Sequence, residues 1–288
     1  MSFFLTIITT KLIVSKELEK KNNNDNDPGI GPHRKDWVNC MKTNVSGYIN
    51  DADSTWQHFY QAVLHCEQLP FIKDLRIQDF PNLDEVKRSI IPRSNEPSVM
   101  ISIGIGHDTV AEENIRKLLP SGTRFYGADP MRAVNEEQYT KFGKYFPFAV
   151  GAESGIRQAS VLKNDNKNLM DYGKQVVVHI DFVYFLKEII KESFIDDVWI
   201  DNEYAEYAMM HYFYRNGTLD RNNITICQFN MEIHGPQDNV HMKETFRQFL
   251  SRLLDDGRYG IFRPVKGGHY RLFFLNLENK KCLEKYVL

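Results

Sequence analysis

The residues best suited to chemistry stand where apolar runs end, and the first group closes the run Val99–Ile105. It reads SIGIGHD and contains Gly104, Gly106, His107 and Asp108. Glycine has no Cβ, so the backbone can turn tightly and approach a ligand, and a helix that follows offers unpaired N–H groups. We expect all four residues to lie at a cofactor site, with Asp108 also capping the helix. A turn without a ligand is the alternative, because G-x-G alone is a weak signal.

A second group, Asp129, Pro130 and Met131, follows the apolar run RFYGA. An acid at this place, about twenty residues after the glycine turn, can accept hydrogen bonds from both hydroxyls of a ribose. A nicotinamide dinucleotide would require a third glycine where Thr109 stands. A cofactor with adenosine but no pyrophosphate fits better, and S-adenosylmethionine is the common one. The alternative for Asp129 is a turn or cap residue before Pro130.

The third group combines two strand ends, WIDNEYAEY and NMEIH. Asp201 is expected at a strand tip beside the cofactor, with Glu203 at the start of the next helix. Glu232 and His234 lie on one side of their strand because side chains alternate with a period of two. We expect Glu203, Glu232 and His234 to orient an acceptor hydroxyl or take its proton. Acids that complement a helix dipole, and a structural histidine, are the alternatives.

These groups need a frame that brings strand ends together. After Pro97, short apolar strands alternate with amphipathic helices, and the chain closes with two strands parted by VKGG. The alternation predicts an α/β fold with a doubly wound, mostly parallel sheet and a C-terminal antiparallel hairpin. Ligands of such sheets bind beyond the carboxyl ends of the strands. The expected strands are VMISIGI, RFYGA, YFPFAVG, QVVVHI, DDVWI, ITICQFNMEI, RYGIFRP and HYRLFFLNL.

Three regions are predicted along the chain. Residues 1–32 join the apolar segment Met1–Val14 to an Asn-rich polar linker. Residues 33–97 are expected to form accessory helices, with TWQHFYQAVLHCEQL at helical spacing and a short LDEVKRSI helix capped by Asn82. Residues 98–288 form the main domain, and the accessory helices are expected to cover one end of it.

Charge and cysteine content narrow the function classes. Lys and Arg total 36 against 38 for Asp and Glu, so the net charge of −2 predicts no nucleic-acid partner. The four cysteines form no CxxC pair, and free buried thiols are expected. The cytoplasm is favoured, although residues 1–14 leave a membrane anchor open and are too short to span a bilayer. Sequons at Asn44, Asn216 and Asn223 would be used only in the secretory pathway.

From about Ser98 onward the sequence resembles the FkbM-type methyltransferases, in particular the nematode proteins with that domain. The resemblance rests on the order and spacing of ISIGIGHD, FYGADP, KYFPFAVG, DDVWIDNEYAEY, CQFNMEIH and RYGIFRP. It implies a class I methyltransferase (Rossmann-like) fold, S-adenosylmethionine as donor, and O-methylation of a hydroxyl on a sugar or small metabolite. Gly104, Gly106 and Asp129 match the family's glycine turn and ribose acid. Its aspartate-x-glutamate-glycine-x-glutamate signature and following strand acid are matched by Asp201, Glu203, Glu206 and Glu232.

Three positions depart from the family pattern. Ser102 stands where the family has an acid that positions the donor, Asp108 replaces a glycine, and Tyr204 replaces the glycine of the signature. The departures motivate a second hypothesis, a binding or scaffold protein on a degenerate fold, in which Ser102→Asp would restore donor binding. A nicotinamide-dependent oxidoreductase, the third hypothesis, lacks the third glycine. No metal is predicted, because no HxxE or HxH spacing accompanies the acids. The acceptor and the oligomeric state stay open.

Overall fold

The computed structural model describes residues 31–162 and 172–288. The apolar segment Met1–Val14 and most of the Asn-rich linker lie outside these residues, so the expectations for them stay untested. Among the helices of the described ranges, none combines the length and the apolar character that a membrane crossing requires.

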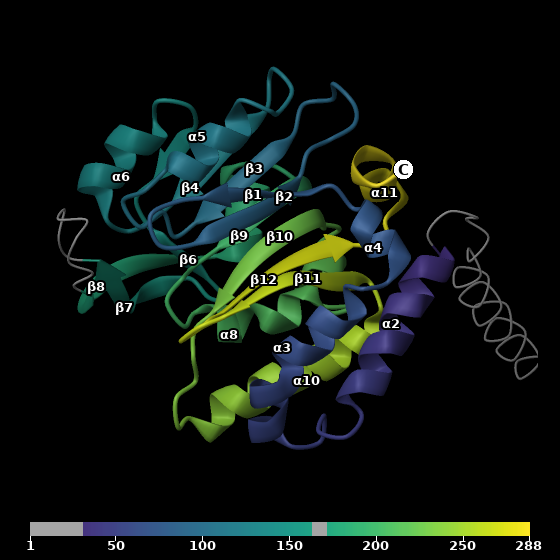
Figure 1. Cartoon of the computed structure of the whole chain (residues 1–288). Coiled ribbons are helices and arrows are strands. Elements are labelled where there is room, and N and C mark those ends of the chain that lie inside the picture. The colour runs from purple at the N-terminus through teal and green to yellow at the C-terminus, as the bar shows by residue number, and fades with distance from the viewer. Residues whose placement is uncertain (1–30, 163–171) are drawn as a thin grey trace, which may run out of the picture.

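A seven-stranded mixed sheet forms the centre of the molecule (Figure 1), in the order β11-β12-β10-β9-β3-β4-β5. Strands β10, β9, β3, β4 and β5 run parallel, and β12 runs antiparallel to both β10 and β11. The strand order reverses between β9 and β3, which is where ligands bind in doubly wound folds. The α/β prediction with its C-terminal hairpin is confirmed. The strands are β3 (Val99–Ile103), β4 (Arg124–Ala128), β5 (Lys144–Phe146), β9 (Phe194–Ile200), β10 (Thr225–Ile233), β11 (Tyr259–Lys266) and β12 (Tyr270–Asn276).

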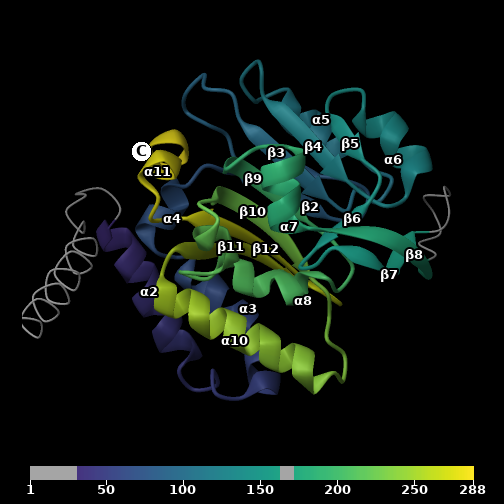
Figure 2. The same cartoon turned by 180° about the vertical axis from the view of Figure 1, so that it is seen from behind.

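Helices pack on both faces of this sheet, because parallel neighbours need crossover connections. Figure 2 shows α7 and α8 on the face turned away from the hairpin of β1 (Ile77–Pro81) and β2 (Val86–Ile90), which is seen in Figure 1. The helix expected to start at Glu203 begins instead at Glu206, and it continues into a 3₁₀-helix after Met209. The helices are α5 (Val110–Arg116), α6 (Arg132–Tyr139), α7 (Phe182–Tyr184), the π-helix η1 (Phe185–Ile189), α8 (Glu206–Met209), the 3₁₀-helix η2 (Met210–Phe213), α9 (Thr218–Arg221) and α10 (Val240–Asp256).

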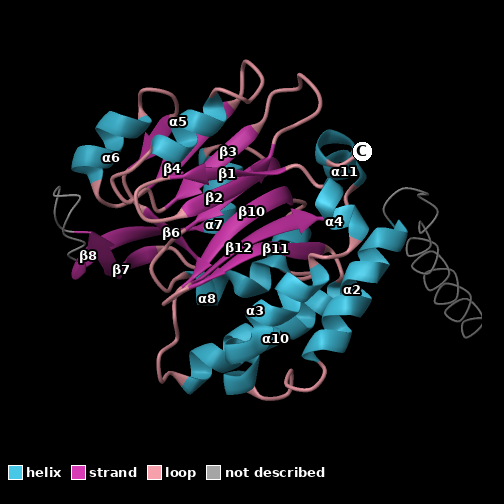
Figure 3. Ribbon diagram, viewed as in Figure 1, coloured by secondary structure: helices cyan, strands magenta, loops and turns pink. Residues whose placement is uncertain are grey.

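The N-terminal accessory region packs against the β11 end of the sheet. Helices α2 (Gly31–Val45) and α3 (Ala52–Cys66) gather beside α10 (Figure 3), and a short α4 (Pro70–Asp74) follows. Helix α3 starts at Asp51, whose carboxylate accepts from the Ser54 N–H, and its apolar face buries Phe59 and Val63. The hydrophobic core of the sheet includes these side chains. The accessory helices therefore extend the core of the sheet; the domain boundary at residue 97 stays a prediction.

The helix predicted for LDEVKRSI is wrong, because this segment contains the strand β2 (Val86–Ile90). It pairs antiparallel with β1 (Ile77–Pro81). Two side chains of β10 hold its other edge: the Asn230 amide bonds the N–H and C=O of Arg88 at 2.8 and 2.7 Å. Gln228 binds Ile90 in the same way at 2.9 and 3.0 Å. These tertiary hydrogen bonds outweigh the local helical signal.

The segment around QVVVHI is a strand, but it does not join the main sheet. It lies in β8 (Tyr172–Asp181), which pairs with β6 (Ala149–Gly151) and antiparallel with β7 (Gly155–Leu162). The run YFPFAVG divides between β5 and β6, so each half serves a different sheet. An apolar run is typical of a strand buried in a parallel sheet. Val176 and Val178 are instead exposed on the small sheet, so the prediction that this run belongs to the main sheet is wrong.

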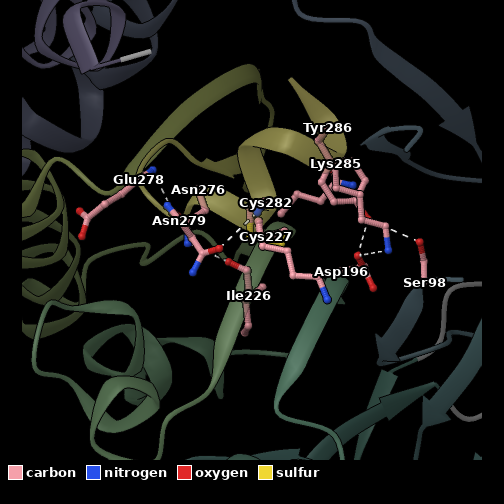
Figure 4. The surroundings of a disulfide bond; sticks show 12 residues. Ser98, Asp196, Ile226, Cys227, Asn276, Glu278, Asn279, Cys282, Lys285 and Tyr286 are labelled. Carbon is pink, nitrogen blue, oxygen red and sulfur yellow. Dashed lines mark hydrogen bonds and ion pairs between the residues drawn. A yellow bond between two sulfur atoms is a disulfide. The ribbon is translucent and has the colours of Figure 1, made fainter. Parts of the chain in front are cut away.

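The expectation of free thiols is wrong, since the structure pairs all four cysteines. Cys40–Cys66 joins α2 to α3, with Cα atoms 5.8 Å apart. Cys227–Cys282 joins β10 to the C-terminal helix α11 (Lys280–Tyr286), with Cα atoms 5.1 Å apart (Figure 4). Both separations suit a disulfide. The sequence spacing carried no signal for this pairing, because the fold brings the partners together.

Candidate active site

A cavity of about 270 Å³ opens at the carboxyl ends of β3, β4 and β9. The cavity lies where the strand order reverses, between β9 and β3, and a ligand was predicted at this edge of the sheet. The small sheet β6-β8-β7 supplies the facing wall, which includes Gln158, Ser160 and Tyr172. The predicted site residues that line the cavity are Gly104, Gly106, His107, Asp129, Pro130, Met131, Asp201 and Glu203.

Different constraints require glycine at the two glycine positions of the turn. Gly104 has φ 77°, and a Cβ there would lie 1.7 Å from the carbonyl oxygen of Asp201. Gly106 has φ 64°, and a Cβ there would meet nothing within 4 Å. The first glycine therefore permits close packing of two strand ends, and the second permits a left-handed turn that borders the cavity.

Asp129 holds the glycine turn in place. Its Oδ2 accepts hydrogen bonds from the N–H groups of Ile105 at 2.9 Å and Gly106 at 3.4 Å, and its Oδ1 accepts from Met131 N–H at 2.7 Å. Burial raises the pKa of Asp129, and the hydrogen bonds from Ile105 and Met131 oppose that shift. The carboxylate thus joins the turn and the β4 end into one wall of the cavity. Its lone pairs leave capacity for further donors, such as ribose hydroxyls.

Asp108 does not line the cavity, so its predicted cofactor role finds no support. The buried carboxylate accepts from the N–H of Leu83 at 2.8 Å and from that of Val110 at 3.0 Å. It connects the start of α5 to the loop between β1 and β2. The expected cap is not formed by Asp108: the N-cap residue of α5 is Thr109, and Asp108 stands one residue before it while accepting from the first helical N–H, that of Val110.

Replacing Asp129 by alanine should weaken S-adenosylmethionine binding by at least about 100-fold, or about 3 kcal/mol, because charged hydrogen bonds to the turn are lost. Asp108→Asn is the matched control: it alters an acid five residues after the end of β3 that does not line the cavity. We expect it to lower stability and keep the dissociation constant within about threefold of wild type. Calorimetric titration of folded variants measures both. Equal losses in the two variants would contradict the assignment to Asp129.

His234 is buried among three carboxylates and does not itself line the cavity, although two of these acids, Asp201 and Glu203, do. Its Nδ1 is 3.2 Å from Glu206 Oε1, and its Nε2 is 3.3 Å from Glu203 Oε2 and 3.7 Å from Asp201 Oδ1. Burial lowers the pKa of His234, but hydrogen bonds to Glu203 and Glu206 and the charge of Asp201 raise it overall, to about 11. Both ring nitrogens therefore carry protons at neutral pH. An imidazolium cannot accept a proton, so this state of His234 does not fit the predicted role of a base, whereas a carboxylate such as that of Glu203 can accept one.

Glu203 reaches the cavity through an unusual backbone. Glu203 and Tyr204 follow one another with φ 51° and 75°, a left-handed conformation that strains residues with a Cβ. The tyrosine ring lies 4.9 Å from the His234 ring and is 39 % exposed. Glycine, which the resemblance implies at the position of Tyr204, adopts this conformation without strain. The tyrosine forms a wall beside the acid and histidine, and the carboxylate still lines the cavity.

Glu232 lies one layer behind the cavity. It is buried and forms an ion pair with Arg271 on β12 at 2.8 Å, which lowers the pKa of Glu232 against the opposing effect of burial. Lys87 on β2 is buried too and pairs with Glu85. Charges of Glu85 and Asp201 raise the pKa of Lys87 despite its burial. Sequence reasoning missed the two cations because the hairpin and β12 lie far from the acidic motif along the chain.

Three overlapping groups of side chains could hold a metal ion in the described part of the chain. Within each group, one ligand atom per residue lies within 4.8 Å of the others. The same carboxylates already face Lys87, Arg271 and protonated His234, so their charge is balanced largely without an ion. The groups are Asp201, Glu203 and His234; Glu232, His234 and His269; and Glu85, Asp201 and Glu232.

Methyl transfer should survive removal of divalent cations, because protein cations already pair with these acids. Activity after dialysis against EDTA should stay within about twofold of the untreated enzyme, measured as transfer of a labelled methyl group. Loss of activity that Mg²⁺ or Mn²⁺ restores would instead assign Asp201, Glu203 and His234 as metal ligands.

Ser102, where the family has an acid, is buried and bonded to a different acid. Its Oγ donates to Glu112 Oε1 at 2.8 Å and accepts from the Tyr139 hydroxyl at 3.2 Å. Burial raises the pKa of Glu112 to about 7. An aspartate at position 102 would place a second carboxylate against Glu112, so Ser102→Asp is expected to destabilise the fold and cannot serve as a clean restoration of donor binding.

Glu112→Gln should stabilise the protein in a pH-dependent way. In wild type, the folded state holds the Glu112 proton more tightly than the unfolded chain does. The resulting contribution to the free energy of unfolding is fully present below pH 4.5 and is lost as the pH rises through about 7. Relative to wild type, the variant should gain about 3 kcal/mol of unfolding free energy between pH 5 and pH 8. Urea denaturation at both values measures it. Exposed Glu113→Gln is the control, and a pH-independent difference for Glu112→Gln would refute the assignment.

The cavity fits an adenosine cofactor with polar ends. Apolar side chains of Ile103, Ala128 and Val150 line its floor. Around it, three buried polar atoms have no hydrogen-bond partner among the described residues: His107 Nδ1, Asp201 Oδ1 and Asn202 Oδ1. Buried polar atoms are normally paired, so these atoms point to a ligand that supplies donors and acceptors.

Fold and site together define a doubly wound α/β protein that binds a nucleotide-type cofactor at the carboxyl edge of its sheet. The chain belongs to the FkbM methyltransferase domain family, whose model matches residues 40–259. Membership of this methyltransferase family confirms the prediction of S-adenosylmethionine as the cofactor. The uncharacterized protein C28H8.7 of Caenorhabditis elegans is 24 % identical over 258 residues, which cover 87 % of this chain and 79 % of the relative.

Solved methyltransferase structures resemble the chain at low overall similarity. The O-methyltransferase TomG from Streptomyces achromogenes, solved in complex with SAM, is 10 % identical with a TM-score of 0.38, covering 63 % of this chain and 74 % of its own. Precorrin-6y C5,15-methyltransferase from Geobacter metallireducens is 10 % identical with a TM-score of 0.34, covering 64 % and 83 %. These likenesses are too distant to transfer any residue role.

Proposed function

We propose that the protein is an S-adenosylmethionine-dependent O-methyltransferase of class I fold that acts on a hydroxyl of a sugar or small metabolite. One observation carries the proposal: the glycine turn, Asp129 and Glu203 line a single cavity, and His234, outside the lining, contacts the Glu203 carboxylate. The first pair of features suits an adenosine cofactor, and the second suits an acceptor hydroxyl. Family membership supports the same activity.

The residues at the two ends of the cavity have different tasks. Gly104, Gly106 and Asp129 would hold the adenosine part, and S-adenosylmethionine, when bound, supplies the methyl group. Glu203 would take the proton of the acceptor hydroxyl while the hydroxyl oxygen bonds to the methyl carbon. The bond between that carbon and the donor sulfur breaks, and the sulfur keeps the electron pair and leaves as S-adenosylhomocysteine. His234 stays protonated and keeps Glu203 in place through the 3.3 Å contact. Methyl transfer requires chiefly alignment and exclusion of water, so few groups need to act on the reacting atoms.

Glu232 is a positioning residue in this scheme. It binds Arg271, which also lies 3.7 Å from Glu85, and Glu85 pairs with Lys87. The network brings the positive charges of Lys87 and Arg271 close to the acids that follow β9. A catalytic contact with the acceptor is not required of it, because its side chain does not line the cavity.

Transfer of a labelled methyl group tests the proposal. Wild-type protein is incubated with S-adenosylmethionine labelled in the methyl carbon and separate pools of monosaccharides, oligosaccharides and phenols. We expect label in at least one hydroxyl-bearing pool and none with Glu203→Gln protein that binds the donor normally. Donor binding without transfer to any pool would favour the alternative, a binding protein on a degenerate fold.

A further inference from the structure

The disulfides constrain where this domain can mature. Cys66, Cys227 and Cys282 are fully buried and Cys40 is half-buried, so the pairs form part of the packed structure. Figure 4 shows Cys227–Cys282 beside the contact between Asp196 and α11, where Lys285 Nζ lies 2.8 Å from Asp196 Oδ1. Disulfides persist in oxidising compartments and are rare in the cytosol, where thiols are kept reduced. Two structural disulfides therefore point to the secretory pathway.

Two of the three sequons present free asparagine amides. Asn216 and Asn223 are exposed, and within the described residues neither side chain makes a hydrogen bond. Each sits in a left-handed turn, with φ 59° and 56°, next to the short helix α9. The hydroxyl residues that complete the sequons are Thr218 and Thr225. Both sites thus have the sequence and the exposure that N-glycosylation requires.

We propose that the protein matures in an oxidising secretory compartment and carries N-linked glycans on Asn216 and Asn223. The disulfides and the exposed sequons are independent observations that require the same compartment. The proposal replaces the cytoplasm as the expected location. It does not depend on which acceptor the cavity binds.

Asn44, in the third sequon, is an internal contrast. It is half-buried, and its Nδ2 donates to the Cys40 carbonyl at 2.9 Å and lies 3.6 and 3.8 Å from the sulfurs of Cys40 and Cys66. A glycan on this nitrogen would break the contact and project into the α2–α3 interface. Asn44 is therefore expected to stay unmodified.

The two glycans would leave the candidate active site open. Asn223 precedes β10, whereas His234 follows the other end of this nine-residue strand. At about 3.3 Å per residue, the two ends lie roughly 30 Å apart. Glycans at the amino edge of the sheet are therefore compatible with a working cavity at its carboxyl edge.

The modification is an ordinary group transfer that needs a lipid-linked oligosaccharide diphosphate as co-substrate. The asparagine amide nitrogen forms a bond to C1 of the first sugar. The bond between C1 and the diphosphate oxygen breaks, the diphosphate leaves with the electron pair, and the amide proton passes to a base of the transferase. The threonine hydroxyl of the sequon is retained.

The test uses the full chain, tagged and isolated from its native cells after rapid acid quenching and thiol alkylation. Peptide N-glycanase in heavy-oxygen water converts each glycosylated asparagine into a labelled aspartate, which peptide mass spectrometry locates. We expect label at Asn216 and Asn223, none at Asn44, and no alkylated cysteine before reduction. Unlabelled asparagines with alkylated cysteines would overturn the proposal, and so would intact disulfides without label.

Matched variants separate loss of the glycan from loss of the fold. Thr218→Ala and Thr225→Ala each destroy one sequon and leave its asparagine in place, so each should remove one step of the glycanase-induced gel shift. Thr218→Ser and Thr225→Ser keep the sequon and should keep the full shift. A shift that survives both alanine changes together, or that disappears with Asn44→Gln, would contradict the assigned sites.

Discussion

Replacing Glu203 by glutamine should lower kcat by about 10²–10⁴ and leave the affinity for S-adenosylmethionine within about threefold of wild type. Glutamine has the same shape and still reaches His234, but it cannot take a proton. The loss therefore falls on the chemical step, since Asp129 and the glycine turn are unchanged. Steady-state rates with the acceptor pool identified by the labelled-methyl assay measure the effect, and calorimetry measures donor binding.

Glu244→Gln serves as the matched control for this substitution. Glu244 on α10 also accepts from a cation, because Arg247 Nη2 lies 2.6 Å from its Oε1, but it lies outside the cavity. We expect its kcat to stay within about twofold of wild type. If Glu203→Gln kept full activity, Glu203 would not be the base, and the protonated His234 would have lost its proposed task as well.

Removing the Cys227–Cys282 disulfide with paired alanines should cost about 4 kcal/mol of unfolding free energy. The bridge spans 55 residues, and closing a loop of that length in the unfolded chain sets this magnitude. Helix α11 would keep its ion pair from Lys285 to Asp196 and the 2.6 Å hydrogen bond from the Tyr286 hydroxyl. We therefore expect a folded but weaker protein, measured by urea denaturation at neutral pH.

The reductant provides the control for the disulfide prediction. Dithiothreitol reduces both disulfides, so wild-type protein unfolded and refolded with excess reductant should approach the stability of a variant in which all four cysteines are alanine. That four-alanine variant should not respond to the reductant. The disulfides must be fully accessible to the reductant while the protein is unfolded. If the free energy of unfolding of wild type were then the same with and without reductant, the disulfides would contribute little to stability.

The sequence was sufficient to predict which residues follow the ends of consecutive parallel strands. The glycine turn and Asp129 follow consecutive strands, and parallel strands bring their carboxyl ends to one edge, so Gly104, Gly106 and Asp129 meet at one cavity. Asp201 and Glu203 arrive by the same rule. Local alternation of strands and helices was therefore sufficient to predict the parallel strands β3, β4, β9 and β10, but not to exclude QVVVHI from the main sheet.

Long-range partners were not predictable. LDEVKRSI reads as a helix because nothing local reveals that Asn230 and Gln228, some 140 residues later, hold its backbone as a strand. The buried Lys87 arrives on that strand. The disulfides depend on packing in the same way. Asp108 was misplaced for the opposite reason: its neighbours in sequence line the cavity, yet its own carboxylate accepts from Leu83 and Val110.

Calorimetric titration of the full chain with S-adenosylmethionine and S-adenosylhomocysteine tests the central claim most directly. The cavity, with its unpaired His107 and Asn202 atoms, predicts one site per chain with a dissociation constant in the micromolar range, near −8 kcal/mol, for both ligands. The binding should be lost in Asp129→Ala and kept in Asp108→Asn. No heat with either ligand, from protein shown by circular dichroism to be folded, would contradict the cofactor site and the methyltransferase activity proposed from it.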